Sequence, residues 1–460
     1  MEVLRRAPML AVLAGLVSGL ALYDRAGIAA FAVMLPAVYA GVMFCSYERE
    51  LPGQWRVFAV GLVICAVCSL RCRLVLTRPQ PQNITLTQAT GTVTDVREWG
   101  RQYVLTINVD GGGRYAMRTR FAEIMQGTRI KFDGVTRSFR KNGNFDEGRF
   151  WGARGVSSWI SIHNVEELPP KFSLARMRYL LSRRLTMYLP DATASYLKAM
   201  WLGERSDLLN RMHRRWGTVH LLAVSGFHVG IVVLCASLVF GKNAVLLSVI
   251  MWLYILLTGA APSALRAGIM FQAGLIARAL GRPVSGVNSV CVAGVCILMW
   301  SPLMFWDIGF RLSVLCALTI TTLPRKWWLA ISPLMFLVSF PQVSRTFGEV
   351  FLVGILLNVF APLYFTFALS VSSVLGMLRL AGVPFAGYMV LAAEGGFLLW
   401  ERAADFAAET VPYTMGWNYL VAWIGAGTLG VCLCRYFDLA PLRALAVTVG
   451  MSFAAFMMFL

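Results

Sequence analysis

Apolar runs of near membrane-spanning length dominate this 460-residue chain and constrain its fold more than any other feature. They fill most of residues 7–76 and recur almost without interruption after residue 217. Hydrophobic residues make up 58% of the chain and charged residues only 14%, whereas about 25% charged is typical of soluble globular proteins. We therefore expect a polytopic α-helical membrane protein with one inserted polar domain. The later apolar segments are expected near residues 245–258, 262–280, 287–300, 305–323, 328–340, 347–369, 371–380, 389–400, 415–434 and 442–460.

Residues 1–76 are predicted to form transmembrane helices. Two arginines at positions 5 and 6 precede an apolar run over 7–23, as in a signal peptide. A second run over 26–45 follows after only two polar residues, which favours a helical hairpin over a cleaved leader. A third run covers 57–70. Because the N-terminal arginines favour a cytoplasmic N-terminus, three crossings place the following domain outside the cytoplasm.

Residues 77–168 change from apolar runs to short segments of alternating polarity. Turn residues such as Asp110-Gly111-Gly112-Gly113 separate these segments. Five short strands in about 90 residues suit a small closed β-barrel, and the OB-fold is the natural candidate. The strands are expected at residues 91–97, 103–110, 115–120, 129–137 and 157–162.

Basic and aromatic residues interleave within this predicted barrel. Single-strand-binding proteins use such pairings, because cations follow the phosphates while aromatic faces stack on bases. The alternative is a barrel whose aromatic residues, including Tyr115, Phe121, Phe132 and Phe139, fill its core and whose charges are merely solvated. The residues predicted to bind DNA are Arg97, Trp99, Arg101, Tyr103, Arg114, Arg118, Arg120 and Lys131.

Residues 169–216 are predicted to form amphipathic basic helices. Leu174, Met177 and Leu180 alternate with arginines such as Arg183 and Arg184. A basic face with an apolar back is typical of a helix on a membrane surface, and the same face could also guide DNA toward a pore. The whole chain carries a formal charge of +19, which indicates an anionic partner: lipid headgroups, nucleic acid or both.

The segment Gly217–Gly230, GTVHLLAVSGFHVG, opens the predicted membrane domain over residues 217–460. If this segment is one helix, His220 and His228 lie about 80° apart and look toward one side. Gly226 and Gly230 form a small-xxx-small pair that allows another helix to approach closely. Polar groups in a membrane helix are costly and normally face protein or water. Simple helix packing with two satisfied histidines is the alternative to a functional role.

Charged residues in the later apolar segments are further candidates. Arg266 shares a helical face with Ser263. Because a charge at the centre of a membrane helix costs about 2.5–3.5 kcal/mol, Arg266 should face a cavity, a partner or, by snorkelling, the interface. Asp307 and Arg311 stand at i and i+4, which favours mutual neutralisation. An acidic stripe over residues 394–409 suits an interfacial helix or a pore wall and receives no role.

Several chemistries are not indicated by the sequence. It has no GxxxxGK[ST] loop and no HExxH pair, so we expect no nucleotide, metal or other cofactor. The ten cysteines all lie in or beside apolar segments, which indicates no disulfide framework in the polar domain. Ser225 lacks the flanking glycines of a nucleophile elbow. No catalytic residue is expected, although an intramembrane hydrolase using Ser225 with His220 or His228 stays an alternative.

Motifs spread over residues 90–362 resemble, in order, those of the ComEC family of competence proteins. HLLAVSGFHVG at 220–230 resembles the family signature HLLA-[IV]-SG-[LF]-HV, and YLKAMWLGERSDLL at 196–209 resembles ALLLGDRSxL. The barrel end, Asn142 to Val156, resembles NPGxFDxxxYLxxxGI without its proline. The later motifs resemble TGxxxSxxRAxxM around Arg266, DxGFQLS with Arg311 in place of glutamine, and NLLxxPL at Asn358 and Pro362, where a broken or kinked helix is expected.

The resemblance implies a channel for single-stranded DNA across the inner (cytoplasmic) membrane during natural transformation, with the barrel outside the cytoplasm. It implies as partners membrane lipids, a DNA receptor, a separate nuclease and a helicase-like motor, with the proton gradient as another energy source and a homo-oligomer left open. The chain is interpreted as a short form without the metallo-β-lactamase-like domain of many relatives. A transporter of lipid or small anions is a further alternative. The residues expected to line the path are His220, Ser225, Gly226, His228, Ser263, Arg266, Asp307, Arg311 and Asn358.

Overall fold

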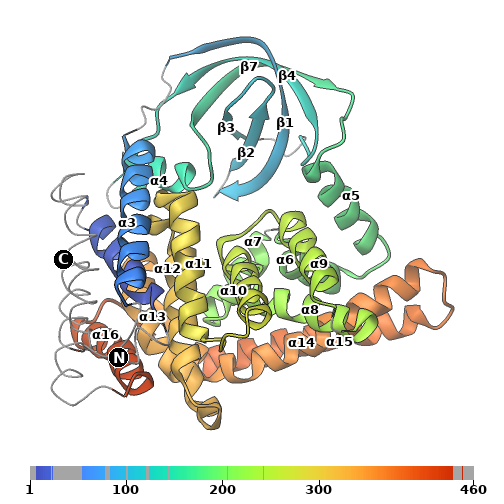
Figure 1. The fold of residues 1–460 in the computed structure, drawn as a ribbon. Coiled ribbons are helices and arrows are strands. Elements are labelled where there is room, and N and C mark those ends of the chain that lie inside the picture. Colours follow the sequence, from blue (N-terminus) through green and yellow to red (C-terminus); the bar gives the residue numbers. More distant parts are fainter. Residues whose placement is uncertain are drawn as a thin grey trace. The chain divides into compact units, whose positions relative to one another are not determined.

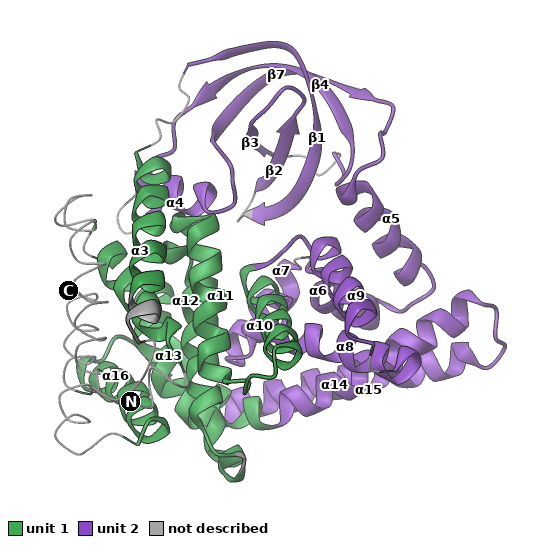
Figure 2. Ribbon diagram, in the orientation of Figure 1, with its two compact units in different colours: residues 1–78, 262–359, 413–460 green, residues 79–261, 360–412 purple. Residues whose placement is uncertain are grey.

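The computed structural model describes residues 7–21, 23, 54–77, 83–99, 102–120, 124–142, 145–204, 206–241, 243–438 and 448. The chain divides into two compact units, each assembled from separate stretches of sequence (Figures 1 and 2). Unit 1 comprises residues 1–78, 262–359 and 413–460, and unit 2 comprises residues 79–261 and 360–412. Residues of the segment 217–460 contribute to both units.

Five strands of unit 2 close into a barrel, which confirms the predicted inserted β-domain. They are β1 (Thr85–Trp99), β2 (Gln102–Val109), β3 (Arg114–Thr119), β4 (Arg129–Arg137) and β7 (Ser158–Leu168). Their order around the barrel is β1-β2-β3-β7-β4, with β7 parallel to β3 and the other pairs antiparallel. The last strand thus inserts between β3 and β4, a crossover expected of a Greek-key barrel such as the OB-fold. Alternate residues fill the interior, among them Val93, Leu105, Ile107, Ile130 and Phe132.

A second, smaller apolar cluster lies on the outside of β2 and β3. The short pair β5 (Lys141–Asn142) and β6 (Phe145–Asp146) leads into α4 (Glu147–Gly152). Asp146 caps this helix by accepting the N–H of Arg149 at 3.0 Å. Trp151 is then buried against the barrel wall, in a cluster with Val104, Ala116, Val156, Phe139, Phe150 and Trp159.

The remaining elements of unit 2 are helices. They are α5 (Leu174–Thr186), α6 (Asp191–Leu202), α7 (Asp207–Arg215), the single 3-10 turn η1 (Val219–Leu221), α8 (Gly226–Phe240), α9 (Ala244–Leu257), α15 (Ala386–Thr410) and most of α14 (Val353–Leu380). An aromatic layer joins α6, α14 and α15. Tyr196 stacks on Phe397 with ring centroids 4.7 Å apart, and Tyr364 stacks on Trp400 at 4.8 Å.

Unit 1 is a helical bundle. It contains the helix Met9–Ala21, α3 (Gln54–Leu76), α10 (Pro262–Ala279), α11 (Gly286–Trp300), η2 (Pro302–Trp306), α12 (Ile308–Thr322), η3 (Arg325–Ala330), α13 (Ile331–Phe347), the two-stranded pair β8 (Val350–Phe351) and β9 (Thr414–Met415), α16 (Tyr419–Tyr436) and the start of α14. Cys65 and Cys68 on α3 are buried and free, as predicted for structural cysteines.

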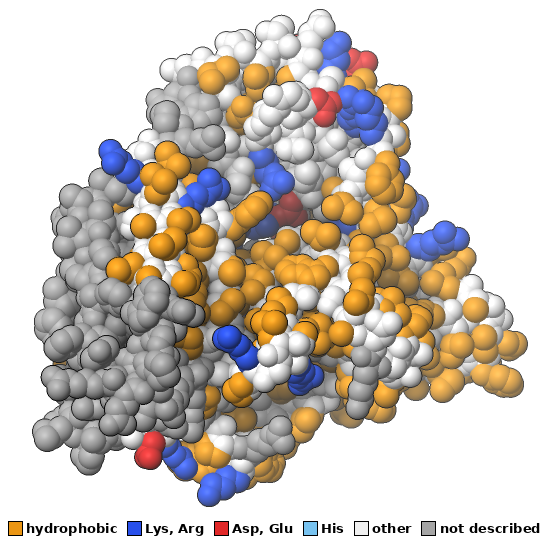
Figure 3. Space-filling model, viewed as in Figure 1, with side chains coloured by type: hydrophobic (Ala, Val, Ile, Leu, Met, Phe, Trp, Pro, Cys, Tyr) orange, Lys and Arg blue, Asp and Glu red, His pale blue; other side chains and the backbone are white. Residues whose placement is uncertain are grey.

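The helices confirm a polytopic membrane protein. Four segments among the described residues are long and apolar enough to cross a bilayer: Ala59–Leu76, Lys326–Phe347, Val353–Leu380 and Tyr419–Tyr436. Shorter apolar helices accompany them, α8, α9, α11 and α12 among them. Apolar side chains cover much of the visible helical surface (Figure 3), as lipid-facing surfaces require.

One predicted break is wrong. The break expected between segments 347–369 and 371–380 is absent, because α14 (Val353–Leu380) runs from residue 353 through Pro362 to residue 380. A proline within a membrane helix is tolerated where neighbouring groups satisfy the freed carbonyl. The expected segments 26–45 and 442–460 lie outside the described residues, apart from Thr448.

Candidate functional site

The signature segment is not one helix, so the predicted alignment of its histidines is wrong. The chain turns at Gly217, whose φ of +66° favours glycine, passes through η1 and restarts as α8 only at Gly226. His220 lies in η1 and is exposed, whereas His228 lies in the first turn of α8 and is fully buried. The physical reason is Ser225, whose extended backbone ends the preceding turn and caps the new helix.

Ser225 and His228 form a reciprocal cap at the start of α8. The backbone N–H of Ser225 donates to Nδ1 of His228 at 3.1 Å, and the Ser225 hydroxyl lies 3.2 Å from the same nitrogen. In return the hydroxyl oxygen accepts the backbone N–H of His228. Because Nδ1 accepts a backbone N–H, the ring proton resides on Nε2. The imidazole therefore fills the position that a glutamate or glutamine usually holds in a capping box.

This geometry bears on the hydrolase alternative. His228 is within hydrogen-bond reach of the Ser225 hydroxyl, but a general base needs a free lone pair, and Nδ1 already accepts a backbone N–H. His228 Nε2 is buried and has no hydrogen-bond partner among the described residues, so no third group orients the ring. Trp201 packs edge-on at 6.1 Å instead. The arrangement is that of a helix cap in an apolar setting.

A buried hydrogen-bond network holds the start of the signature segment. His213 Nε2 lies 3.1 Å from the Tyr196 hydroxyl, and its Nδ1 lies 2.8 Å from the Thr218 hydroxyl. The side chains of all three residues are fully buried. Burial lowers the pKa of His213 to about 3, so the imidazole is neutral. Sequence reasoning missed His213, because a histidine within the charged run RMHRRW reads as a solvated surface residue.

The acidic stripe on α15 contacts the helices on either side of this network, α6 and α7. Glu394 accepts the backbone N–H groups of Ala192 and Thr193 at 3.0 and 2.7 Å, and thereby caps α6 from another helix. Asp405 accepts the indole N–H of Trp216 at 2.9 Å. Glu401 hydrogen-bonds Tyr196, and its pKa is raised mainly by burial and then by its acidic neighbours. Three acidic residues of α15 thus form hydrogen bonds to α6 or to Trp216 at the end of α7. The stripe is therefore neither a membrane-interface face nor a pore wall.

Gly230 does not play its predicted packing role. A Cβ added at this position would meet no described atom within 4 Å, so no neighbouring helix approaches there. Gly226 opens α8 directly after the cap, where a small residue adjoins the buried imidazole.

The charged candidates of unit 1 form hydrogen bonds to backbone groups. Arg266 on α10 donates to the carbonyl of Ser313 on α12, and it follows Ser263 by one helical turn as predicted. Asp307 is the N-cap of α12 and accepts the N–H of Phe310 at 3.1 Å. Arg311 donates to the carbonyl of Trp306 at 3.3 Å. Asn358 lies on α14, in the part of that helix that belongs to unit 1.

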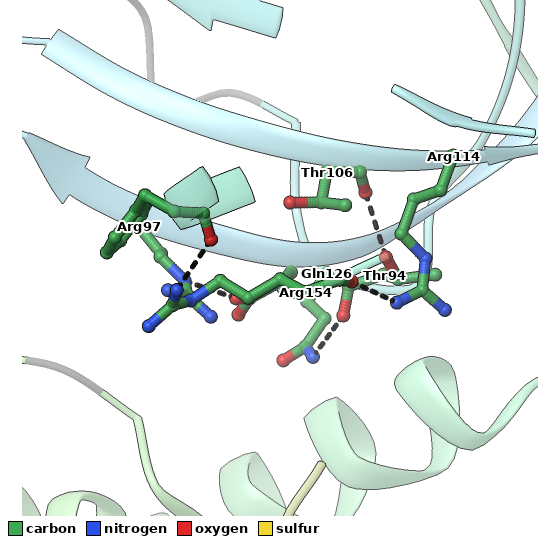
Figure 4. A network of polar contacts seen from close by, with 8 residues as sticks. Thr94, Arg97, Thr106, Arg114, Gln126 and Arg154 are labelled. Carbon is green, nitrogen blue, oxygen red and sulfur yellow. Dashed lines mark hydrogen bonds and ion pairs between the residues drawn. The ribbon is translucent and has the colours of Figure 1, made fainter. Parts of the chain in front are cut away.

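Three of the predicted DNA-binding residues share the outer face of the barrel. Arg97, Val104 and Arg118 stand in one register row across β1, β2 and β3, so both arginines point outward with Val104. Arg114 lies on the same face, four residues before Arg118 on β3, and donates to the carbonyl of Arg154 at 3.1 Å (Figure 4).

Acidic and aromatic neighbours fix these arginines in place. Arg97 pairs with Asp95 at 2.5 Å. Arg118 pairs with Glu147 at 2.7 Å and stacks over Trp159 at 4.3 Å. Arg154, which the sequence reading did not select, stacks over Phe150 at 3.8 Å. The outer face therefore combines cations with aromatic rings, as single-strand binding requires.

The other predicted barrel contacts are dispersed. The Tyr103 hydroxyl lies 3.4 Å from Glu98, and Arg120 is exposed beyond the end of β3. Lys131 lies on β4 in register with Glu166. Trp99 ends β1, and Arg101 lies outside the described residues. For Tyr115 and Phe132 the structural reading is right, because both are buried in the barrel core.

Comparison with known proteins gives a consistent assignment. A sequence model of the family described as "Competence protein" matches residues 200–439. ComE operon protein 3 from Bacillus subtilis (strain 168) is 28% identical over 286 residues, which are 58% of this chain and 34% of that protein. The match thus spans about a third of the relative's length. No solved structure matches this chain.

The family match covers more than half of the chain. It includes the Ser225–His228 cap, the His213 and Thr218 pair, and the acidic residues of α15 that contact α6 and α7. The chain therefore belongs to the ComEC family of competence proteins.

Proposed function

We propose that this protein passes DNA, as a single strand, across the cytoplasmic membrane during natural transformation. The observation that carries the proposal is the arginine-rich outer face of the barrel, joined within one unit to the membrane helices of a competence-family protein. The name of the Bacillus relative, ComE operon protein 3, agrees with a role in competence.

Capture would begin at the barrel, which we place outside the cytoplasm. Arg97, Arg114, Arg118 and Arg154 supply cations for phosphates, and the aromatic cluster around Trp159 supplies apolar surface beside them. The phosphate backbone then provides most of the affinity, so binding falls with salt with a slope of about −0.7 per phosphate contacted. Neutralising one contacting arginine should reduce that slope by somewhat less than one.

Transit would follow polar residues of the helical region. The proposed lining comprises His220, Ser225, Gly226 and His228 in unit 2, and Ser263, Arg266, Asp307, Arg311 and Asn358 in unit 1. The strand would be delivered by a DNA receptor and a separate nuclease and drawn inward by a helicase-like motor or the proton gradient. Membrane lipids, and further copies of this chain if it oligomerises, complete the proposed assembly.

The test is uptake of labelled DNA into the cytoplasm of cells that carry His228→Ala or Arg266→Ala. Matched controls are His163→Ala, at an exposed position of β7, and Arg278→Ala, in the last turn of α10. We expect both test variants to lose internalisation while membrane levels and surface-bound DNA stay normal. Normal internalisation in both would remove these two motifs from the path.

One observation favours a second candidate function, an intramembrane hydrolase. It is the 3.2 Å separation of Ser225 Oγ and His228 Nδ1. Ser225→Asn separates the two functions, because asparagine still caps a helix but cannot act as a nucleophile. Full DNA uptake in this variant excludes a nucleophilic role of Ser225 in uptake.

A lipid or small-anion transporter is distinguished by binding. The full-length protein in nanodiscs should bind single-stranded oligonucleotides, and Arg118→Gln should weaken that binding. No salt-dependent binding by the unsubstituted protein would favour the transporter.

A further inference from the structure

Helix α5, which follows the barrel, buries three polar residues and exposes three large apolar residues in its first two turns, with Arg183 and Arg184 exposed in its last turn. The buried residues are Ala175, Arg178, Ser182 and Thr186. The outward residues include Leu174, Met177 and Leu180, which are 51%, 39% and 48% exposed. A helix on a water-soluble protein has the opposite pattern. Exposed leucine costs nothing against lipid, so the pattern indicates that α5 meets the bilayer with one side and a polar environment with the other.

The buried side of α5 is a polar stripe, which we define as Arg178, Ser182 and Thr186. Residues at these spacings share one helical face. Ser182 is 2% exposed, and Thr186 donates its hydroxyl to the Ser182 carbonyl at 2.9 Å. The helix packs here on α6, α9 and β1, all within unit 2. The stripe therefore runs inside this unit, starting beside the barrel.

Arg178 lies on the stripe with a charge that the protein matches incompletely. Its side chain is only 9% exposed, and its Nε–H has no hydrogen-bond partner among the described residues. The guanidinium lies against two glycine turns. Nη2 is 3.5 Å from the position of a Cβ on Gly203, and Nη1 is 3.0 Å from that on Gly259. Asp95 and Glu204 are the opposite charges that act on it, and Arg97 is the like charge. A buried cation without direct partners is costly and calls for an anion.

The barrel continues this line of cations. Asp95 pairs with Arg97 and also acts electrostatically on Arg178, and Arg97 Nη1 is buried without a partner among the described residues. Arg154 and Arg114 follow along the same face (Figure 4). Arg178, Arg97, Arg114 and Arg154 thus outnumber Asp95 and Glu204, the two carboxylates that act on Arg178, so the net charge of this group is positive.

We propose that the polar stripe of α5 carries the phosphodiester backbone of the incoming strand from the barrel inward, and that Arg178 is its phosphate-binding residue. The inference rests on the proposed function and adds a site to it. Ser182 offers a hydroxyl donor to the same backbone one turn farther along, and Thr186 follows one turn beyond, with its hydroxyl donated to the Ser182 carbonyl. The rival is a purely structural Arg178, stabilised by the carbonyl ends of α6 and α9.

Cysteine capture tests the stripe in the full-length protein. Ser182→Cys lies on the stripe, and Leu180→Cys lies on the outward side of the same helix. The probe is a single-stranded oligonucleotide that carries pyridyl disulfide groups along its backbone, supplied to transforming cells. We expect capture by Ser182→Cys well above the background of the unsubstituted protein, and none by Leu180→Cys. Capture at both positions, or at neither while uptake proceeds, overturns the proposal.

Charge substitution tests Arg178 itself. Arg178→Gln is compared with Arg178→Lys and with Arg183→Gln, an exposed arginine of the same helix. We expect Arg178→Gln to lower internalisation at least tenfold at normal membrane level, Arg178→Lys to retain part of it, and Arg183→Gln to match the unsubstituted protein. With a neutral methylphosphonate strand the tenfold difference should disappear. Equal internalisation by Arg178→Gln and Arg183→Gln overturns the proposal.

The proposed function and the proposed phosphate site can be disproved separately. If deletion of the whole chain leaves internalisation unchanged, the proposed function is wrong. If deletion abolishes internalisation while Arg178→Gln transports normally, only the phosphate site is wrong. Should Arg178→Gln fail to accumulate in the membrane, the Ser182→Cys and Leu180→Cys comparison decides alone, because neither substitution touches the buried charge.

Discussion

Acidification from pH 7 to pH 5 should destabilise unit 2 through His213. The neutral ring bridges Tyr196 and Thr218, and burial lowers its pKa from 6.5 to about 3. The unfolded chain therefore takes up a proton below pH 6.5, whereas the folded protein does so only near pH 3. Stability contributed by this group is present above the unfolded pKa and is lost as the pH falls through that window. At pH 5 the loss is about 2 kcal/mol, from 1.36 kcal/mol per unit over roughly 1.5 units.

The assay is thermal unfolding of the full-length protein in nanodiscs at both pH values. For a unit of this size, about 2 kcal/mol corresponds to a fall in Tm of roughly 4–8 °C. His213→Gln should unfold at lower temperature at pH 7 but lose this part of the pH dependence. His163→Gln, an exposed histidine of β7, is the control and should keep it.

The difference between variants is the decisive quantity, because other groups also titrate. Glu401 has a raised pKa, so its contribution to stability grows as the pH falls and opposes that of His213. Asp110 has a pKa lowered by hydrogen bonds from Thr90 and Arg129, and its contribution is lost only below the window studied. If the unsubstituted protein and His213→Gln show the same fall in Tm from pH 7 to pH 5, the ring is not held neutral by the fold.

Three further substitutions test the packing described above. Glu394→Gln should cost about 1–2 kcal/mol, because it removes the charge that caps α6, whereas Glu409→Gln on the exposed end of α15 should change stability by less than about 0.5 kcal/mol in the same thermal assay. Gly425→Ala should destabilise unit 1 by about 1–3 kcal/mol, since a Cβ there would clash with the Leu337 carbonyl. The control Gly230→Ala should be neutral or stabilising, because a Cβ there meets no described atom. A comparable loss of stability in both variants would contradict these contacts. Trp151→Ala should lower the stability of the barrel by about 3–5 kcal/mol, measured as faster proteolysis of the barrel. Unchanged protease resistance would show that the indole is not part of its packing.

The barrel could be predicted from sequence because its signal is local. Alternation of apolar and polar residues from Leu105 to Val109, and of buried and half-buried residues along β4, leaves little freedom in assigning strands, as do the glycine turns between them. The same alternation placed Arg97, Arg114 and Arg118 correctly among candidate surface residues. It could not reveal that Arg154 joins them, because that residue arrives from the loop after α4.

The signature segment was harder to predict because its hydrophobicity resembles that of a continuous helix. Hydrophobic periodicity does not reveal that Ser225 and His228 cap a new helix, although a serine three residues before a side-chain acceptor is a capping signal. The role of His213 was beyond local reasoning. Its environment is supplied by Tyr196 and Thr218, and the acidic partners of this frame lie on α15, almost two hundred residues away.

That separation has a consequence for how the protein is made. Glu394 caps α6 across 201–202 residues of sequence, and Asp405 reaches Trp216 across 189. At roughly 5–20 residues per second of synthesis, α15 is made about 10–40 seconds after α6 and α7. During that interval the first turn of α6 and the Trp216 indole have no carboxylate partner. Assembly at the ribosome is therefore completed late, and a nascent chain that stops before residue 386 should be recognised by membrane proteases as unfinished.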